Sequence, residues 1–170
     1  MSVNIPPRQF AHLNLAHDIA QILGQAGIEP GGLELEILET VAMGDSETAN
    51  QVLSELKAVG ARLSIDDFGT GYSSLSRLQD LPIDTVKIDR SFIAPLDEKT
   101  ASREIVRTIV LLAHAIGLRV VAEGVETEKQ AQVLKTLGCD LAQGFFFGRP
   151  ENAKNVGALL VSASLAERAR

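Results

Sequence analysis

Several carboxylates in this chain lie within or directly after short apolar runs, where a strand would deliver them to a site. Among them are Glu36, Asp66, Asp67 and Glu123. Carboxylates that converge on one site repel one another, so they need cations. Ligand sets made only of oxygen atoms suit Mg²⁺ or Mn²⁺ rather than Zn²⁺. The pattern therefore predicts a divalent metal site.

The adjacent pair Asp66-Asp67 favours two metal ions over one, because neighbouring carboxylates can serve two ions at once. Gly69 and Gly71 follow the pair and allow the backbone to turn sharply behind it. Two metals about 4 Å apart form a common clamp for in-line displacement at a phosphodiester. Phosphodiester hydrolysis is thus the chemistry that the pair suggests.

Lys87 lies between Val86 and Ile88 inside an apolar run. A lysine in such a position needs a counter-charge, since an isolated buried ammonium is very costly. We expect Lys87 to lie among the carboxylates.

Other polar residues are less fixed by their spacing. Glu34 and Glu36 alternate with leucines and so share one strand face, which must point into the barrel if either is a ligand; spacing alone does not decide this. Glu123 and Glu126 flank Gly124, and either could take part in the site. Gln143 follows the last apolar run.

The elements that must position these residues alternate along the chain. Six apolar runs are candidate strands: Val3–Ile5, Leu33–Leu38, Leu63–Ile65, Val86–Ile88, Val120–Ala122 and Leu141–Ala142. Glycine closes four of the intervening helical stretches, at Gly27, Gly60, Gly117 and Gly138. Strand and helix in alternation predict βαβ units and a parallel sheet.

Helices are indicated by apolar residues at helical spacing. One follows Pro6-Pro7 and is marked by Phe10, Leu13, Ile19, Ile22 and Leu23; a second is marked by Ala49, Val52, Leu53, Leu56 and Val59; a third by Ile105, Ile109, Leu112 and Ile116. Thr127 and Gln130 form a capping box at the start of another. The range 152–166 suggests a final helix, and His12, His17 and His114 all fall in predicted helices.

An open doubly wound sheet and a (β/α) barrel both fit this order of elements. The sequence has neither G-x-G-x-x-G nor G-x-x-x-x-G-K-[ST], which disfavours a nucleotide-binding open sheet. Polar residues at nearly every strand end would meet at the mouth of a barrel but would spread along the edge of an open sheet. The barrel is the preferred prediction.

Length and composition set limits. The chain has 170 residues, of which 45% are hydrophobic and 22% charged, so it is typical of one globular domain and not of a disordered or collagen-like protein. A net charge of −6 offers no basic surface for nucleic acid, so no DNA partner is expected.

Cellular location is predicted from what the chain contains. Cys139 is the one cysteine, so no internal disulfide can form, and we expect it to be a packing thiol. The first residues have no charged segment before an apolar core, unlike a signal peptide. The longest apolar stretch, near Ile109–Ile116, is too short to cross a bilayer. We expect a cytoplasmic protein with no membrane segment.

Four motifs resemble the EAL-domain family of bacterial cyclic di-GMP phosphodiesterases. They are Ser64–Leu75 (SIDDFGTGYSSL), Val86–Phe92 (VKIDRSF), Val120–Glu126 (VVAEGVE) and Ala142–Pro150 (AQGFFFGRP). The resemblance runs in order from Val3 to Pro150. It implies a TIM-like barrel with one strand reversed and a site with two Mg²⁺ or Mn²⁺ ions that hydrolyses cyclic di-GMP to linear pGpG.

The family's name-giving Glu-Ala-Leu segment would precede Val3, and a whole barrel takes about 250 residues. We therefore expect residues 1–170 to be the C-terminal two-thirds of one EAL-type domain. The predicted fold class is α/β, an incomplete TIM-like (β/α) barrel of about six parallel strands with helices outside. Unpaired sheet edges would then favour self-association, such as a homodimer.

The resemblance also implies roles for individual residues. Those matching metal ligands are Asn4, Glu36, Asp66, Asp67 and Glu123, the last two on the side of the second metal. Those matching catalytic or supporting residues are Lys87, which would orient the attacking water, Glu39, which would steady the loop Phe68–Ser74 associated with dimerisation and activation, Gln143 and Glu126.

Two alternatives stay open. The chain could be a non-catalytic module that binds cyclic di-GMP or a protein partner, or a metal-dependent barrel enzyme of the enolase kind. The resemblance further implies upstream sensor or GGDEF domains in a longer parent protein.

Overall fold

The computed structural model describes residues 1–44, 47–71 and 75–157. Its sheet consists of β1 (Ser2–Ile5), β2 (Glu34–Leu38), β3 (Arg62–Phe68), β4 (Thr85–Ile88), β5 (Arg119–Ala122) and β6 (Leu141–Ala142). All neighbours pair in parallel, and the spatial order is β1-β2-β3-β4-β5-β6. Strands that follow one another in sequence lie side by side, as in the wall of a (β/α) barrel. The predicted six-stranded α/β fold is confirmed, with the wall open between β1 and β6 in the described residues.

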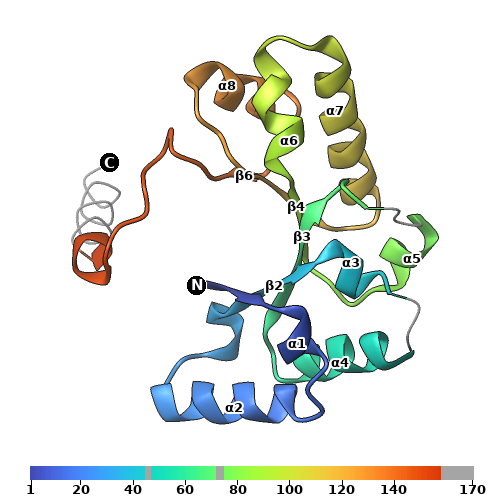
Figure 1. The fold of residues 1–170 in the computed structure, drawn as a ribbon, viewed down its shortest axis with the longest axis vertical. Coiled ribbons are helices and arrows are strands. Elements are labelled where there is room, and N and C mark those ends of the chain that lie inside the picture. The colour runs from blue at the N-terminus through green and yellow to red at the C-terminus, as the bar shows by residue number, and fades with distance from the viewer. Residues whose placement is uncertain (45–46, 72–74, 158–170) are drawn as a thin grey trace.

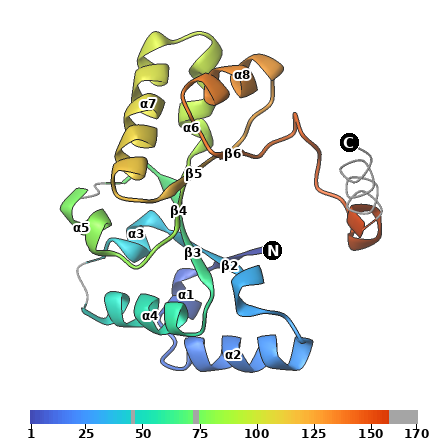
Figure 2. The ribbon, with the colours of Figure 1, turned by 180° about the vertical axis from the view of Figure 1, so that it is seen from behind.

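Helices connect the strands. They are α1 (Pro7–Phe10), α2 (Leu15–Ala26), α3 (Glu39–Ala42), α4 (Glu47–Ala58), α5 (Leu75–Asp80), α6 (Arg90–Ile93), α7 (Thr100–Ala115) and α8 (Glu128–Thr136), with 3₁₀ turns η1 (Pro30–Gly32) and η2 (Ala94–Asp97). Figure 1 and the opposite view in Figure 2 show these helices in an arc along one side of the sheet. On the other side both views show the C-terminal segment of the described chain, whose residues 153–157 are helical and stand apart from the sheet.

The two faces of the sheet differ in chemistry because strand side chains alternate. The face toward the helices is apolar and buried: it carries Ile5, Leu35, Ile37, Leu63, Ile65, Val86, Ile88, Val120 and Ala122. Strand register places polar residues on the opposite, concave face: Asn4, Glu34, Glu36, Ser64, Asp66, Thr85, Lys87 and Arg119. The core therefore holds the sheet to its helices, and the concave face is left for chemistry.

Local signals predicted several boundaries correctly. Gly27, Gly60, Gly117 and Gly138 all have positive φ, between 64° and 93°, where glycine is the least strained residue. The Thr127 hydroxyl accepts a hydrogen bond from the Gln130 N–H, and the Gln130 side chain accepts from the Thr127 N–H, so the capping box is confirmed.

Three helix predictions need correction. The helix after Pro6-Pro7 is split into α1 and α2, because Ala11 ends α1 and residues 11–14 turn; His12 is therefore not helical. Leu13 and Ile22 are 89% and 61% exposed, so they do not mark a core-facing stripe. On α7 the buried face is shifted: Val106, Ile109, Val110 and Ala113 are buried, whereas Ile105 is exposed.

Two further predictions concern the final helix of the chain and a membrane-spanning segment. Of the final helix predicted over 152–166, residues 153–157 are helical, Asn152 lies just before the helix, and residues 158–166 lie outside the described part of the chain. Among the residues that the structure describes, no helix is both long enough and apolar enough to traverse a bilayer.

Candidate active site

Lys87 occupies the centre of the concave face and contacts three carboxylates. Its Nζ lies 2.7 Å from Glu36 Oε2, 3.3 Å from Asp66 Oδ1 and 2.5 Å from Glu123 Oε1. Strand β4 places Lys87 between the strands that supply these acids, and its side chain is 5% exposed. The counter-charge expected for a buried lysine is thus provided by β2, by β3 and by the end of β5.

Electrostatics keep Lys87 a cation. Burial favours the neutral amine, but hydrogen bonds to Glu123 and Glu36 outweigh it and raise the pKa of Lys87 above its ordinary value. The ammonium can therefore donate hydrogen bonds but does not serve as a general base near neutral pH.

Asp66 and Asp67 reach the same site because β3 is irregular there. Consecutive strand residues normally point to opposite faces. The pairing register with β4 shifts between Ile65 and Phe68, and Asp67 has φ of 56°, in the left-handed region. The Asp67 N–H donates to Asp66 Oδ1 at 3.1 Å. One carboxylate oxygen each from Asp66, Asp67 and Glu123 then lie within 4.8 Å of one another.

The negative charges of this cluster repel one another and are partly buried, which disfavours ionisation of its carboxylates. Burial, together with repulsion from Asp66 and Asp89, raises the pKa of Asp67. Burial also raises the pKa of Glu123, although Lys87 opposes that shift. Three oxygen donors at such a separation, with carboxylates that are hard to keep ionised, fit a divalent cation of the Mg²⁺ or Mn²⁺ type.

Gln143 and Glu126 lie beside the cluster. The Gln143 side chain donates Nε2–H to Glu123 Oε1 at 2.6 Å, so it fixes the orientation of that carboxylate. Glu126 is exposed and lines, with Asp67, Glu123 and Gln143, an open pocket of about 560 Å³. The structure therefore brings both residues to the site region but joins only Gln143 to the acids by a hydrogen bond.

Asn4 and Glu39 stand at different distances from the cluster. Asn4 is exposed on β1 and lies opposite Glu36 in register, on the same concave face. Glu39 begins α3, is 2% exposed, and accepts hydrogen bonds from the N–H groups of Gly69 at 2.8 Å and Gly71 at 3.4 Å. It thus supports the start of the predicted loop Phe68–Ser74, of which residues 72–74 lie outside the described part of the chain.

Asp89 and Arg90 received no role from the sequence alone, yet both line the pocket beside Glu123. Their signal was their place directly after β4, at the end of the sheet where the other site residues gather. Cys139 is half-buried against the core, and burial raises the pKa of its thiol to about 11, as expected for a packing residue.

Comparison with known proteins decides the family. Residues 1–150 match the model of the EAL domain. The chain belongs to the EAL domain family. In sequence it is 44% identical over 156 residues to the bifunctional diguanylate cyclase/cyclic di-GMP phosphodiesterase MucR of Pseudomonas aeruginosa, covering 92% of this chain and 23% of MucR. The enolase alternative is thereby set aside.

Solved EAL structures share the fold. The MucR phosphodiesterase in complex with c-di-GMP superimposes with a TM-score of 0.87 at 44% identity, over 91% of this chain and 63% of that one. The EAL domain of Mycobacterium smegmatis DcpA gives 0.89 at 43%, over 95% and 72%. Klebsiella pneumoniae BlrP1, in a manganese/cy-diGMP complex, gives 0.81 at 33%, over 88% and 38%. The chain spans less than a quarter of the length of the first curated relatives that it matches.

Proposed function

We propose that this chain hydrolyses cyclic di-GMP to linear pGpG with two divalent ions, Mg²⁺ or Mn²⁺. The observation that carries the proposal is the convergence of Asp66, Asp67 and Glu123 within 4.8 Å, next to a lysine that is paired with carboxylates. The relatives crystallised with c-di-GMP, one of them with manganese, support the same substrate and metal class.

Asp66, Asp67 and Glu123 would hold the ions, with Glu36 and Asn4 on the same face as further oxygen ligands. When bound, the ions supply positive charge for an anionic phosphodiester and activate water for in-line attack. The protein's own part is orientation: Gln143 holds Glu123, and Glu39 holds the backbone after Asp67. Lys87, whose Nζ contacts the carboxylates of the site, would donate hydrogen bonds to the attacking water or to a phosphoryl oxygen.

The decisive test is incubation of the 170-residue chain with cyclic di-GMP and Mn²⁺ or Mg²⁺, with pGpG resolved by chromatography. Asp66→Asn is the matched variant, because it keeps the shape of the side chain and removes its charge. We expect pGpG from the chain and a loss of several orders of magnitude in the variant. Equal rates in the two proteins would remove Asp66 from the site.

A second candidate is a module that binds cyclic di-GMP without hydrolysing it. This candidate is kept because the match covers only 63% of the MucR phosphodiesterase chain, so more than a third of that chain has no counterpart in the match. Calorimetric binding of cyclic di-GMP by folded protein that forms no pGpG would establish this candidate and reject hydrolysis by the 170-residue chain.

Self-association and upstream sensor or GGDEF domains complete the proposal. A named GGDEF-type activity in a relative, the diguanylate cyclase of MucR, supports the second of these.

A further inference from the structure

Two glutamates of β2 share the concave face, and the structure gives each its own cation. Glu36 Oε2 lies 2.7 Å from Lys87 Nζ. Glu34, two residues earlier on the same strand, has its Oε2 3.8 Å from Nη2 of Arg119. Both pairs line one hollow of about 230 Å³. The two glutamates of this strand thus take part in two separate ion pairs.

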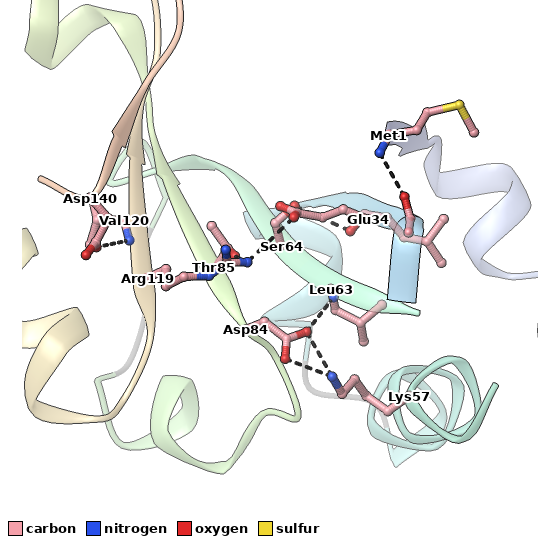
Figure 3. Close-up of polar contacts among 12 residues, drawn as sticks. Met1, Glu34, Lys57, Leu63, Ser64, Asp84, Thr85, Arg119, Val120 and Asp140 are labelled. Carbon is pink, nitrogen blue, oxygen red and sulfur yellow. Dashed lines mark hydrogen bonds and ion pairs between the residues drawn. The ribbon is translucent and has the colours of Figure 1, made fainter. Parts of the chain in front are cut away.

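Arg119 reaches Glu34 across the sheet. It begins β5, and β3 and β4 lie between that strand and β2. On the way, Arg119 Nη2 donates to Thr85 Oγ1 at 3.2 Å. Thr85 is buried, pairs with Arg119 in register and precedes Lys87 by two residues on β4. Figure 3 shows Arg119, Thr85 and Glu34 meeting over the concave face.

The charges explain why this contact matters. The Glu34 side chain is 19% exposed, so a carboxylate there keeps little of its hydration and needs a partner. Lys87 also lies on the concave face, two residues beyond Thr85 on β4, and Glu36 already engages it. An unpaired Glu34 would then compete with Glu36 for Lys87 and disturb the orientation of the carboxylates that Lys87 holds.

We propose that Arg119 is a positioning residue of the site. By engaging Glu34, it leaves Lys87 to orient Glu36, Asp66 and Glu123. This inference rests on the proposed function, because it assigns Arg119 a task only if the cluster binds divalent ions.

The test measures Mn²⁺ binding to the 170-residue chain by electron paramagnetic resonance of the free ion. The variants are Arg119→Gln, Glu34→Gln, their combination and the conservative Arg119→Lys. We expect Arg119→Gln to weaken Mn²⁺ binding about tenfold, the lower end of the range found when interactions that support metal ligands are removed. Adding Glu34→Gln should restore binding to within about twofold of the parent, because an uncharged side chain at position 34 no longer competes for Lys87. Arg119→Lys should lie between.

Arg62→Gln is the matched control. Arg62 lies opposite Glu34 in register on β3, but its side chain is exposed. Its replacement by Gln changes the net charge of the chain as much as Arg119→Gln does. We expect it to leave Mn²⁺ binding unchanged. If it weakens binding as much as Arg119→Gln, general charge explains the effect and the inference fails.

The remaining outcomes also decide. Parent-like binding by Arg119→Gln, or a double variant as weak as the single one, would overturn the role of Arg119 while leaving the proposed function intact. A parent chain that is folded and binds no Mn²⁺ would overturn both. If Arg119→Gln alone does not fold by circular dichroism, the double variant decides: parent-like binding supports the inference and weak binding contradicts it.

Discussion

The ammonium of Lys87 and the amide of Gln143 approach the same oxygen atom of Glu123, at 2.5 Å and 2.6 Å. These donors come from β4 and from the end of β6, on the two sides of β5. Glu123 is thus held from both neighbours while its carboxylate faces Asp66 and Asp67. The acids that would ligate metal are pre-positioned by Lys87 and Gln143 before any ion arrives.

Replacing Lys87 with Met tests how much the acidic cluster depends on it. The change leaves the buried Glu36 and the half-buried Asp66 and Glu123 without their shared cation. Breaking a buried ion pair on one side costs about 3–5 kcal/mol. We expect a loss of that order in the free energy of unfolding in urea, and no pGpG.

Lys57→Met is the control for this comparison. Lys57 pairs with Asp84 at 2.8 Å, but both side chains are about a third exposed. A pair of that kind contributes about 0–1 kcal/mol. Equal losses of unfolding free energy in Lys57→Met and Lys87→Met would show that Lys87 stabilises the chain no more than an exposed lysine does.

The sequence predicted the sheet well because each strand is short and rich in apolar residues, and because a glycine ends the helix that precedes β2, β3, β5 and β6. It also predicted that carboxylates surround Lys87, since a buried lysine between Val86 and Ile88 needs a counter-charge. It could not show how Asp66 and Asp67 both reach the site, because that depends on a register shift against β4. Nor could it find Arg119, whose partner Glu34 lies three strands away.

Gly71 is predicted to accept no side chain. A Cβ there would lie 2.7 Å from Glu39 Oε1, and Glu39 is fixed by its hydrogen bond from the Gly69 N–H. Gly71→Ala must displace the carboxylate or the backbone, at a cost of roughly 1–3 kcal/mol as for other overpacked sites. We expect pGpG formation to fall along with urea stability.

Gly24→Ala is the control for Gly71→Ala, and we expect it to raise the stability in urea. Gly24 lies within α2, with no atom within 4 Å of a Cβ, so alanine should stabilise the helix by about 0.5–1 kcal/mol. Unchanged activity and stability in Gly71→Ala would contradict the role assigned to Glu39.

Asp140 links stability to acid pH. Burial opposes its ionisation, but hydrogen bonds from His114 and from the Val120 N–H, each at 2.8 Å, outweigh it and lower the pKa of Asp140 below 3.8. A depressed carboxyl pKa contributes stability above the unfolded value that is lost as pH falls through the folded one. We expect Asp140→Asn to lower the melting temperature at pH 7 and to have little effect below the folded pKa. Asp80→Asn, on the surface of α5, should leave the melting temperature unchanged at both pH values. An effect of Asp140→Asn on the melting temperature that is the same at both pH values would refute the linkage.

Divalent ions should stabilise the chain through the acidic cluster. A ligand at one hundred times its dissociation constant adds about 2.7 kcal/mol. We expect Mn²⁺ to raise the melting temperature, a chelator to reverse the rise, and Asp67→Asn or Glu123→Gln to abolish it. Glu151→Gln, outside the cluster, should retain the rise. A shift of equal size in all variants would place the bound ions elsewhere.

Self-association is the final expectation, and it follows from the open edges of the sheet. Strand β1 pairs only with β2 in the described residues, and Val3 on it is 40% exposed. An apolar groove of about 570 Å³ runs beside this strand and along α2, where Ile22 is 61% exposed. Exposed edges of this kind recruit another strand unless charge blocks them. We expect sedimentation at tens of micromolar to show dimers or larger species, and Val3→Lys combined with Ile22→Lys to shift the chain toward monomer. A monodisperse monomer of the parent chain would refute the expectation, and association unchanged by the two lysines would assign it to a different surface.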